Sequence, residues 1–169
     1  MLGFLFRGLT AEGQRGTALF DALTAEVRQA YWYVEGEVPD TLDGRFGVLA
    51  TVTALALVRL ERDGDNGDTV SVALTERFVE VMESEHRELG LGDPTLGKTV
   101  RKLVSMLARR TELWRSAASK GDWIEATRDS LYRNNVSAAA LDHSSRSLKS
   151  FWDRLEATSL RGLEQGKIA

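Results

Sequence analysis

The segment between Pro94 and Lys120 constrains the fold of this chain more than any other. Its mainly apolar pattern recurs at steps of three and four residues: Leu96, Val100, Leu103, Leu107, Thr111, Trp114 and Ala118. At about 100° per residue in an α-helix, these positions share one face. The spacing therefore predicts a long amphipathic helix that packs this face against a core.

Similar spacing predicts helices in most of the remaining chain. The expected ranges are about 17–34, 41–62, 69–89, 122–134 and 138–156. No segment alternates apolar and polar residues over the length of a strand. A chain of 169 residues is long enough for one domain with a sizeable core. The sequence predicts an all-α fold, a single irregular bundle of about six helices spanning residues 1–169.

Turn and capping residues mark the expected helix ends. Pro39 restricts the residue before it, Asp40 is placed to cap the next helix, and Asp43 falls in the first turn of that helix. The polar, glycine-rich segment 63–68 is expected to be a loop. The other expected caps are Gly90 at a helix C-terminus, Asp93 ahead of Pro94, and Asp122 with Glu125 as a capping box.

Cysteine content and hydropathy exclude several classes of protein. The chain has no cysteine, which rules out disulfides, thiolate zinc sites and thiol nucleophiles. The 13 uncharged residues between Arg45 and Arg59 are too few to span a bilayer and are expected to form a buried helix. The apolar start, Met1 to Phe6, is too short for a signal peptide, so we expect a cytoplasmic protein. Residues 1–15 are expected to be flexible, either docking on the domain or touching a membrane.

Charge is segregated along the chain although the net charge is only −3. From Pro94 to Lys120 there are seven basic residues and one acid, Glu112, whereas the preceding segment is rich in glutamate. On the helix predicted there, four cations fall opposite the apolar face. We name these four the basic stripe: Lys98, Lys102, Arg109 and Lys120. The near-neutral total charge does not indicate a DNA-binding protein.

The segment Gly92 to Thr99 matches the pattern of a phosphate-binding P-loop. That chemistry needs a strand that leads into a loop whose backbone amides cradle phosphates. Here the preceding residues predict a helix, and Pro94 removes one amide from the cradle. We interpret the segment as a turn between helices and expect no nucleotide or other cofactor.

Other candidate chemistry has simpler explanations. The two histidines, His86 and His143, are too few for a histidine metal site. Asp40 and Asp43 are explained by capping rather than by acid–base catalysis, and the serines near His143 lack a nucleophile elbow. We therefore expect no catalytic or metal-binding residues and no small-molecule substrate. The four tryptophans are expected in the core or at its edge: Trp32, Trp114, Trp123 and Trp152.

Two turn-like segments are more distinctive than ordinary helix punctuation. One runs from Val38 to Phe46 (VPDTLDGRF) and the other from His86 to Lys98 (HRELGLGDPTLGK). Together they resemble the ubiquinol–cytochrome c chaperone family, over about residues 19–118. The short N-terminus is similar to that of the bacterial branch of this family.

The resemblance implies a non-enzymatic assembly chaperone. Members of the family bind newly made cytochrome b and aid assembly of the cytochrome bc1 complex. In mitochondria they act beside a small helper protein and near the ribosomal tunnel exit. The motif residues that would contact a partner are Pro39, Asp40, Asp43, Arg45, Phe46, Arg87, Glu88, Gly92, Asp93 and Lys98.

On this basis we hypothesise a groove around the two turns that holds an apolar segment of the client. Phe46 and neighbouring apolar side chains would line the groove, with Arg45, Arg87 and Lys98 at its rim. The basic stripe would face anionic lipid headgroups, with peripheral contact at the inner membrane, or ribosomal RNA, or simply solvent. Two other functions stay open: a helical adaptor for an unrelated partner, and a phosphate- or nucleotide-binding protein at Gly92 to Thr99.

Overall fold

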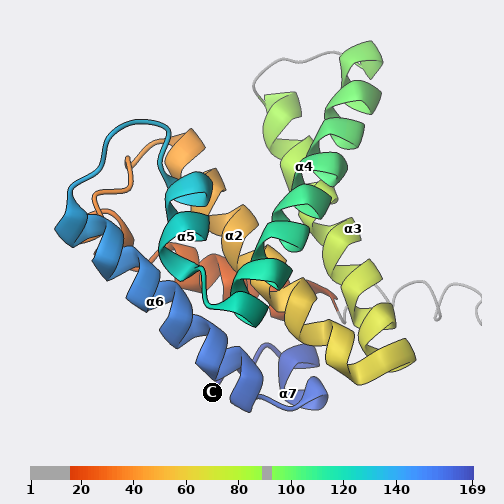
Figure 1. Cartoon of the computed structure of the whole chain (residues 1–169). Coiled ribbons are helices and arrows are strands. Elements are labelled where there is room, and N and C mark those ends of the chain that lie inside the picture. The colour runs from red at the N-terminus through yellow and green to blue at the C-terminus, as the bar shows by residue number, and fades with distance from the viewer. Residues whose placement is uncertain (1–15, 89–92) are drawn as a thin grey trace, which may run out of the picture.

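The computed structural model describes residues 16–88 and 93–169. These residues form helices and turns without any strand, which confirms the predicted all-α fold (Figure 1). The first helix covers residues 16–27 of the described part. It is followed by η1 (Ala30–Trp32), α2 (Leu42–Leu60), η2 (Glu61–Asp63), α3 (Gly64–Glu88), α4 (Asp93–Lys120), α5 (Trp123–Leu131), α6 (Ala138–Ala157) and α7 (Leu160–Glu164).

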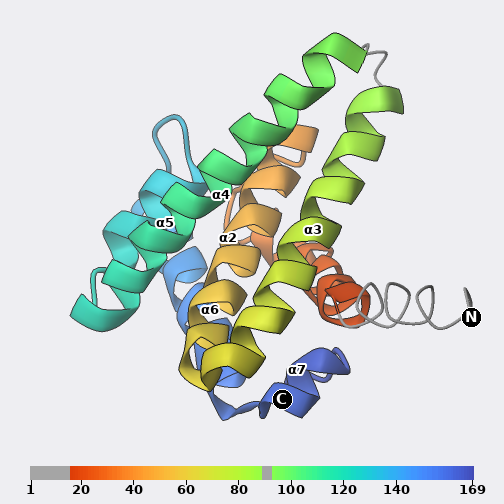
Figure 2. The same cartoon turned by 90° about the vertical axis from the view of Figure 1, so that its right-hand side faces the viewer.

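Helix α2 is the centre of the molecule and packs against α3, α4, α5 and α6 (Figures 1 and 2). Residues 48–56 of this helix are all buried. Their sequence has no charged side chain and no polar face, so every side of the helix can be covered by a neighbour. This confirms the expected buried helix between Arg45 and Arg59.

The core is built around aromatic side chains. Trp32, Trp114, Phe78 and Phe151 are fully buried, and Trp152 is nearly so. Trp123 is half-buried, with its ring centroid 5.5 Å from that of Trp114. The prediction that the tryptophans lie in the core or at its edge is confirmed.

Helices α3 and α4 form an antiparallel pair that extends beyond the rest of the molecule (Figures 1 and 2). Both helices contribute buried apolar side chains to the core, among them Leu74 and Phe78 of α3 and Leu103 and Leu107 of α4. Among residues 16–88 and 93–169, no helix is both long and apolar enough to cross a bilayer.

The prediction of a loop at residues 63–68 is wrong. The segment contains the end of η2 and the first turn of α3. Gly64 makes the sharp bend with φ +55°, and Gly67 lies against the carbonyl of Leu60, where an added Cβ would approach the oxygen to 1.9 Å. The glycines therefore allow a tight junction between two helices rather than a flexible loop.

The first helix ends at residue 27, earlier than the predicted 34, and η1 follows it. Trp32 donates from Nε1 to the carbonyl of Glu26 over 3.1 Å, and the Tyr33 hydroxyl donates to the carbonyl of Val27 over 2.7 Å. These side chains occupy carbonyls that a continuing helix would pair with its own amides. Helix α5 also ends early, at Leu131.

Two predicted caps are wrong. Thr41, rather than Asp40, caps α2 by accepting from the Gly44 amide over 3.2 Å, while Asp40 pairs with Arg45. Asp122 occupies the N-cap position of α5, but its side chain makes no capping hydrogen bond. Asp43 does lie in the first turn of α2, as predicted. Gly90 lies outside the described residues. Asp93 is the first residue of α4, and its side chain lies outside the described part of the structure.

Candidate functional site

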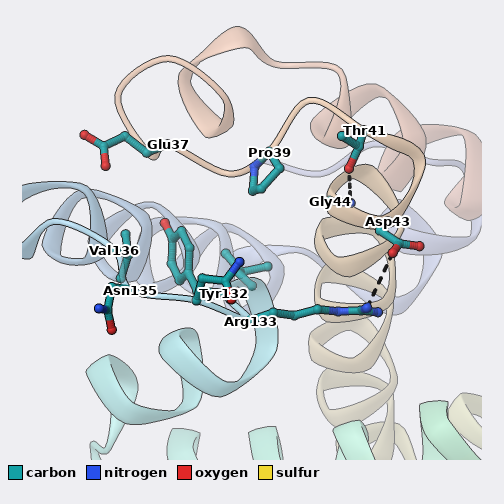
Figure 3. A pocket seen from close by; sticks show the side chains of 11 residues that line it. Glu37, Pro39, Thr41, Asp43, Gly44, Tyr132, Arg133, Asn135 and Val136 are labelled. Atoms are coloured by element: carbon teal, nitrogen blue, oxygen red, sulfur yellow. Dashed lines mark hydrogen bonds and ion pairs between the residues drawn. The ribbon is translucent and has the colours of Figure 1, made fainter.

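A pocket of about 250 Å³ lies between the segment that leads into α2 and the segment that follows α5 (Figure 3). We name it the turn pocket. Its first wall is formed by Glu37, Pro39, Thr41, Asp43 and Gly44, and its second by Leu131, Tyr132, Arg133, Asn134, Asn135 and Val136.

Backbone contacts hold the first wall in place. The Val38 amide donates to the carbonyl of Trp32 over 3.0 Å, and the Val38 side chain is buried. The Thr41 amide donates to the carbonyl of Pro39 over 2.8 Å. The turn packs directly against Gly44 of α2. Only glycine fits there, because a Cβ would lie 1.9 Å from the Pro39 oxygen.

Tyr132 fastens the second wall to the segment ahead of α2. Its hydroxyl donates to the carbonyl of Gly36 over 2.5 Å and is hydrogen-bonded to Ser144 Oγ over 2.7 Å. Burial raises the pKa of Tyr132 above its ordinary value, so the hydroxyl keeps its proton further into the basic range. Gly36 cannot carry a side chain without a clash, since a Cβ would lie 2.6 Å from Ser144 Oγ.

Charged side chains at the pocket pair across its edge. Arg133 reaches from the second wall to Asp43 at the start of α2, with nitrogen and oxygen 3.5 Å apart (Figure 3). Arg45 donates from Nε to Asp40 over 2.6 Å, and its guanidinium lies 5.0 Å from the centre of the Tyr33 ring. The Asp40 contact raises the pKa of Arg45, which stays charged in any case.

The segments around the turn pocket carry exposed apolar side chains. Leu42 is 69% exposed and lies between the wall residues Thr41 and Asp43, and Val34 is 68% exposed in the turn after η1. The pocket itself adds Pro39, Leu131 and Val136. Apolar contact area beside amide side chains such as Asn134 and Asn135 suits a polypeptide segment better than a small polar molecule.

The structure brings only part of the hypothesised groove into this site. Pro39 and Asp43 line the turn pocket, and Asp40 and Arg45 lie next to it. Phe46 is half-buried and packs towards α3, with its ring centroid 6.1 Å from that of Phe78. Glu88 and Lys98 are exposed on α3 and α4. Gly92 and the side chains of Arg87 and Asp93 lie outside the described residues, so a groove shared by both turns stays a prediction.

Sequence reasoning missed the second wall. The sequence predicts only that a helix ends near Asn134, and it does not indicate a site at Tyr132 or Arg133. Tyr132 and its partner Gly36 are 96 positions apart in the chain, and no local pattern predicts such a contact.

Among the described residues, no group of three or more His, Asp or Glu side chains is arranged to hold a metal ion. The segment that precedes the P-loop pattern is helix α3, as predicted, rather than a strand. All four residues of the basic stripe are exposed on α4.

Comparisons with known proteins agree on one relationship. A family model for the ubiquinol–cytochrome c chaperone matches residues 34–164. The crystal structure of the Cbp3 homolog from Brucella abortus has the same fold, with a TM-score of 0.82 and 23% identity, covering 100% of this chain and 96% of that one. No curated protein sequence matches the chain.

Proposed function

The chain belongs to the ubiquinol–cytochrome c chaperone family, and we propose that it binds newly made cytochrome b and aids assembly of the bc1 complex. The family match carries this proposal, because it runs from residue 34 to residue 164 and so includes both walls of the turn pocket. The proposed role is that of a binding protein, without a chemical step and without a cofactor.

We place the client contact at the turn pocket. A membrane protein that has not yet assembled exposes apolar segments, and its loops carry backbone groups without partners. Leu42 and Val34 offer exposed apolar contact, and Asn134 and Asn135 offer side-chain donors and acceptors to a backbone. The Arg133–Asp43 and Arg45–Asp40 pairs provide the polar rim that such a contact needs.

The first experiment removes the gene from the organism that carries it. We expect membranes of this strain to lose cytochrome b haem absorbance and quinol–cytochrome c reductase activity, while another respiratory complex, such as succinate dehydrogenase, keeps its activity. Expression of the intact protein should restore both signals. An unchanged bc1 content would contradict the proposed function.

The second experiment locates the client by photo-crosslinking. A photoreactive amino acid at Leu42 should form a product with pulse-labelled cytochrome b. The matched control carries it at Val72, which is 59% exposed on α3. Equal products from both positions, or none from Leu42 in a strain with normal bc1 assembly, would place the client elsewhere. Recovery of an unrelated partner alone would favour the adaptor function.

A further inference from the structure

The cations of the basic stripe differ from most other cations of this protein. Lys98, Lys102, Arg109 and Lys120 are exposed, and none of them forms an ion pair with another described residue. Arg101, also exposed and without such a pair, lies on the same side of α4. Most other described cations have an acidic partner: Arg45, Arg59, Arg62, Arg77, Arg115, Arg128, Arg133, Arg146, Lys149 and Arg154.

The one acid between Pro94 and Lys120 is already occupied. Between Pro94 and Lys120 the sequence contains a single acid, Glu112. Glu112 pairs with Arg115, and Arg115 also binds Glu61 over 2.5 Å at the end of α2. The stripe therefore has no acid of its own helix as an ion-pair partner, and its four cations lie along one side of α4. From Lys98 to Lys120 this side is about 33 Å long, at about 1.5 Å per residue.

The neighbouring helix carries the opposite charge. Glu76, Glu80 and Glu85 are exposed on α3, which contacts α4 and diverges from it away from their connection (Figure 2). A negatively charged plane would attract α4 and repel α3, so this pair of helices has one favoured orientation on such a plane.

The side chains of the stripe fit a lipid surface better than RNA. Proteins that bind unpaired RNA combine cations with exposed aromatic rings that stack on bases. The one aromatic residue of α4, Trp114, is fully buried. Anionic headgroups require only clustered lysine and arginine close to a flat surface, and a straight row of cations meets that requirement.

We propose that the basic stripe docks this protein on membranes that contain anionic phospholipids. Docking would hold α4 against the headgroups and leave the glutamates of α3 in solution. The proposal concerns the purified protein and a lipid surface, so it stands or falls independently of the identity of the client.

The test measures binding of the full chain to phosphatidylcholine vesicles with and without phosphatidylglycerol, at low and at high salt. We expect binding only to the anionic vesicles, with loss at high salt. The variant Lys98→Gln/Lys102→Gln/Arg109→Gln should bind roughly 100-fold more weakly, since each cation near such a surface contributes about fivefold.

A matched control changes the same number of exposed cations that have no ion pair with a described residue. It is the variant Arg28→Gln/Arg161→Gln/Lys167→Gln, with one position directly after the first helix and two in or just after α7. Its affinity should fall by no more than about twofold, because these charges lie away from the stripe. Circular dichroism checks that both variants are folded.

Three results would overturn the proposal. The first is equal binding of the intact chain to neutral and anionic vesicles. The second is an equal loss of vesicle affinity in the two triple variants. The third is binding of purified ribosomal RNA by the intact chain without any binding to anionic vesicles. The last result would assign the stripe to RNA instead.

Discussion

At the scale of single residues, Gly44 shows how close backbone contact shapes the turn pocket. A Cβ at this position would lie 1.9 Å from the Pro39 oxygen, a backbone atom that cannot move without displacing the first wall. Gly47 lies one turn later in α2. A Cβ added there would lie 3.5 Å from its nearest neighbour, the Ser130 carbonyl oxygen, which is an ordinary van der Waals contact. The two glycines look alike in sequence, but only Gly44 is required by its surroundings.

We expect Gly44→Ala to lower the free energy of unfolding by about 2 kcal/mol, because the helix and the turn must separate to admit the methyl group. Gly47→Ala is the control and should be neutral or stabilising by up to about 1 kcal/mol, since alanine favours the helix. Urea unfolding followed by circular dichroism measures both. Equal effects of the two changes would show that the Pro39 contact does not control the turn.

At the scale of helices, Arg110 joins three elements at the centre of the molecule. From α4, its Nη1 donates to the Gly47 carbonyl over 3.0 Å, to Thr51 Oγ1 over 2.8 Å and to the Ser130 carbonyl over 2.9 Å. The first two acceptors belong to α2 and the third to α5. Burial lowers the pKa of Arg110, and the hydrogen bonds offset part of the cost of enclosing its charge.

We expect Arg110→Met to lower the free energy of unfolding by about 2 kcal/mol, because acceptors on two helices lose their donor. Arg109→Met offers a matched control at the neighbouring, exposed position, and its effect should stay within about 0.5 kcal/mol. Chemical unfolding of the two variants gives the comparison. A small effect at Arg110 would mean that water replaces the guanidinium without loss.

At the scale of the whole molecule, three tyrosines fasten the segment between the first helix and α2 to the rest of the chain. Tyr31 donates to Glu26, which also binds Arg154 of α6 over 2.7 Å. Tyr33 donates to the Val27 carbonyl, and Tyr132 to the Gly36 carbonyl. Burial raises the pKa of all three hydroxyls above the ordinary value of 10.

The raised pKa values predict a loss of stability in base. Above about pH 10 the tyrosines of the unfolded chain lose their protons, whereas those of the folded protein keep them. The unfolded state then binds fewer protons, so the free energy of unfolding falls as the pH rises. Urea midpoints between about pH 8 and about pH 11 should show this fall, with a smaller one in Tyr132→Phe than in the parent protein. Identical falls would show that Tyr132 does not contribute.

The sequence by itself determined the fold class, the apolar face of α4, the buried helix α2 and the core positions of the tryptophans. These features follow from hydrophobic periodicity, which depends on neighbouring residues and on the burial of apolar surface. The helix junction at residues 63–68 and the cap at Thr41 were not predicted. Several neighbouring residues in each segment could form the turn or the cap. Which of them does so depends on the contacts that it makes in the folded protein.

Only the tertiary structure decided the second wall of the turn pocket and the central position of Arg110. Tyr132 reaches Gly36 across 96 positions, and Arg110 reaches Gly47 across 63. A hydrogen bond between distant residues leaves no periodic trace in the sequence, because it depends on how the helices pack and not on the local spacing of side chains. The same holds for the basic stripe. The sequence predicts its place on α4. Its lack of acidic partners among the described residues is seen only in the folded structure.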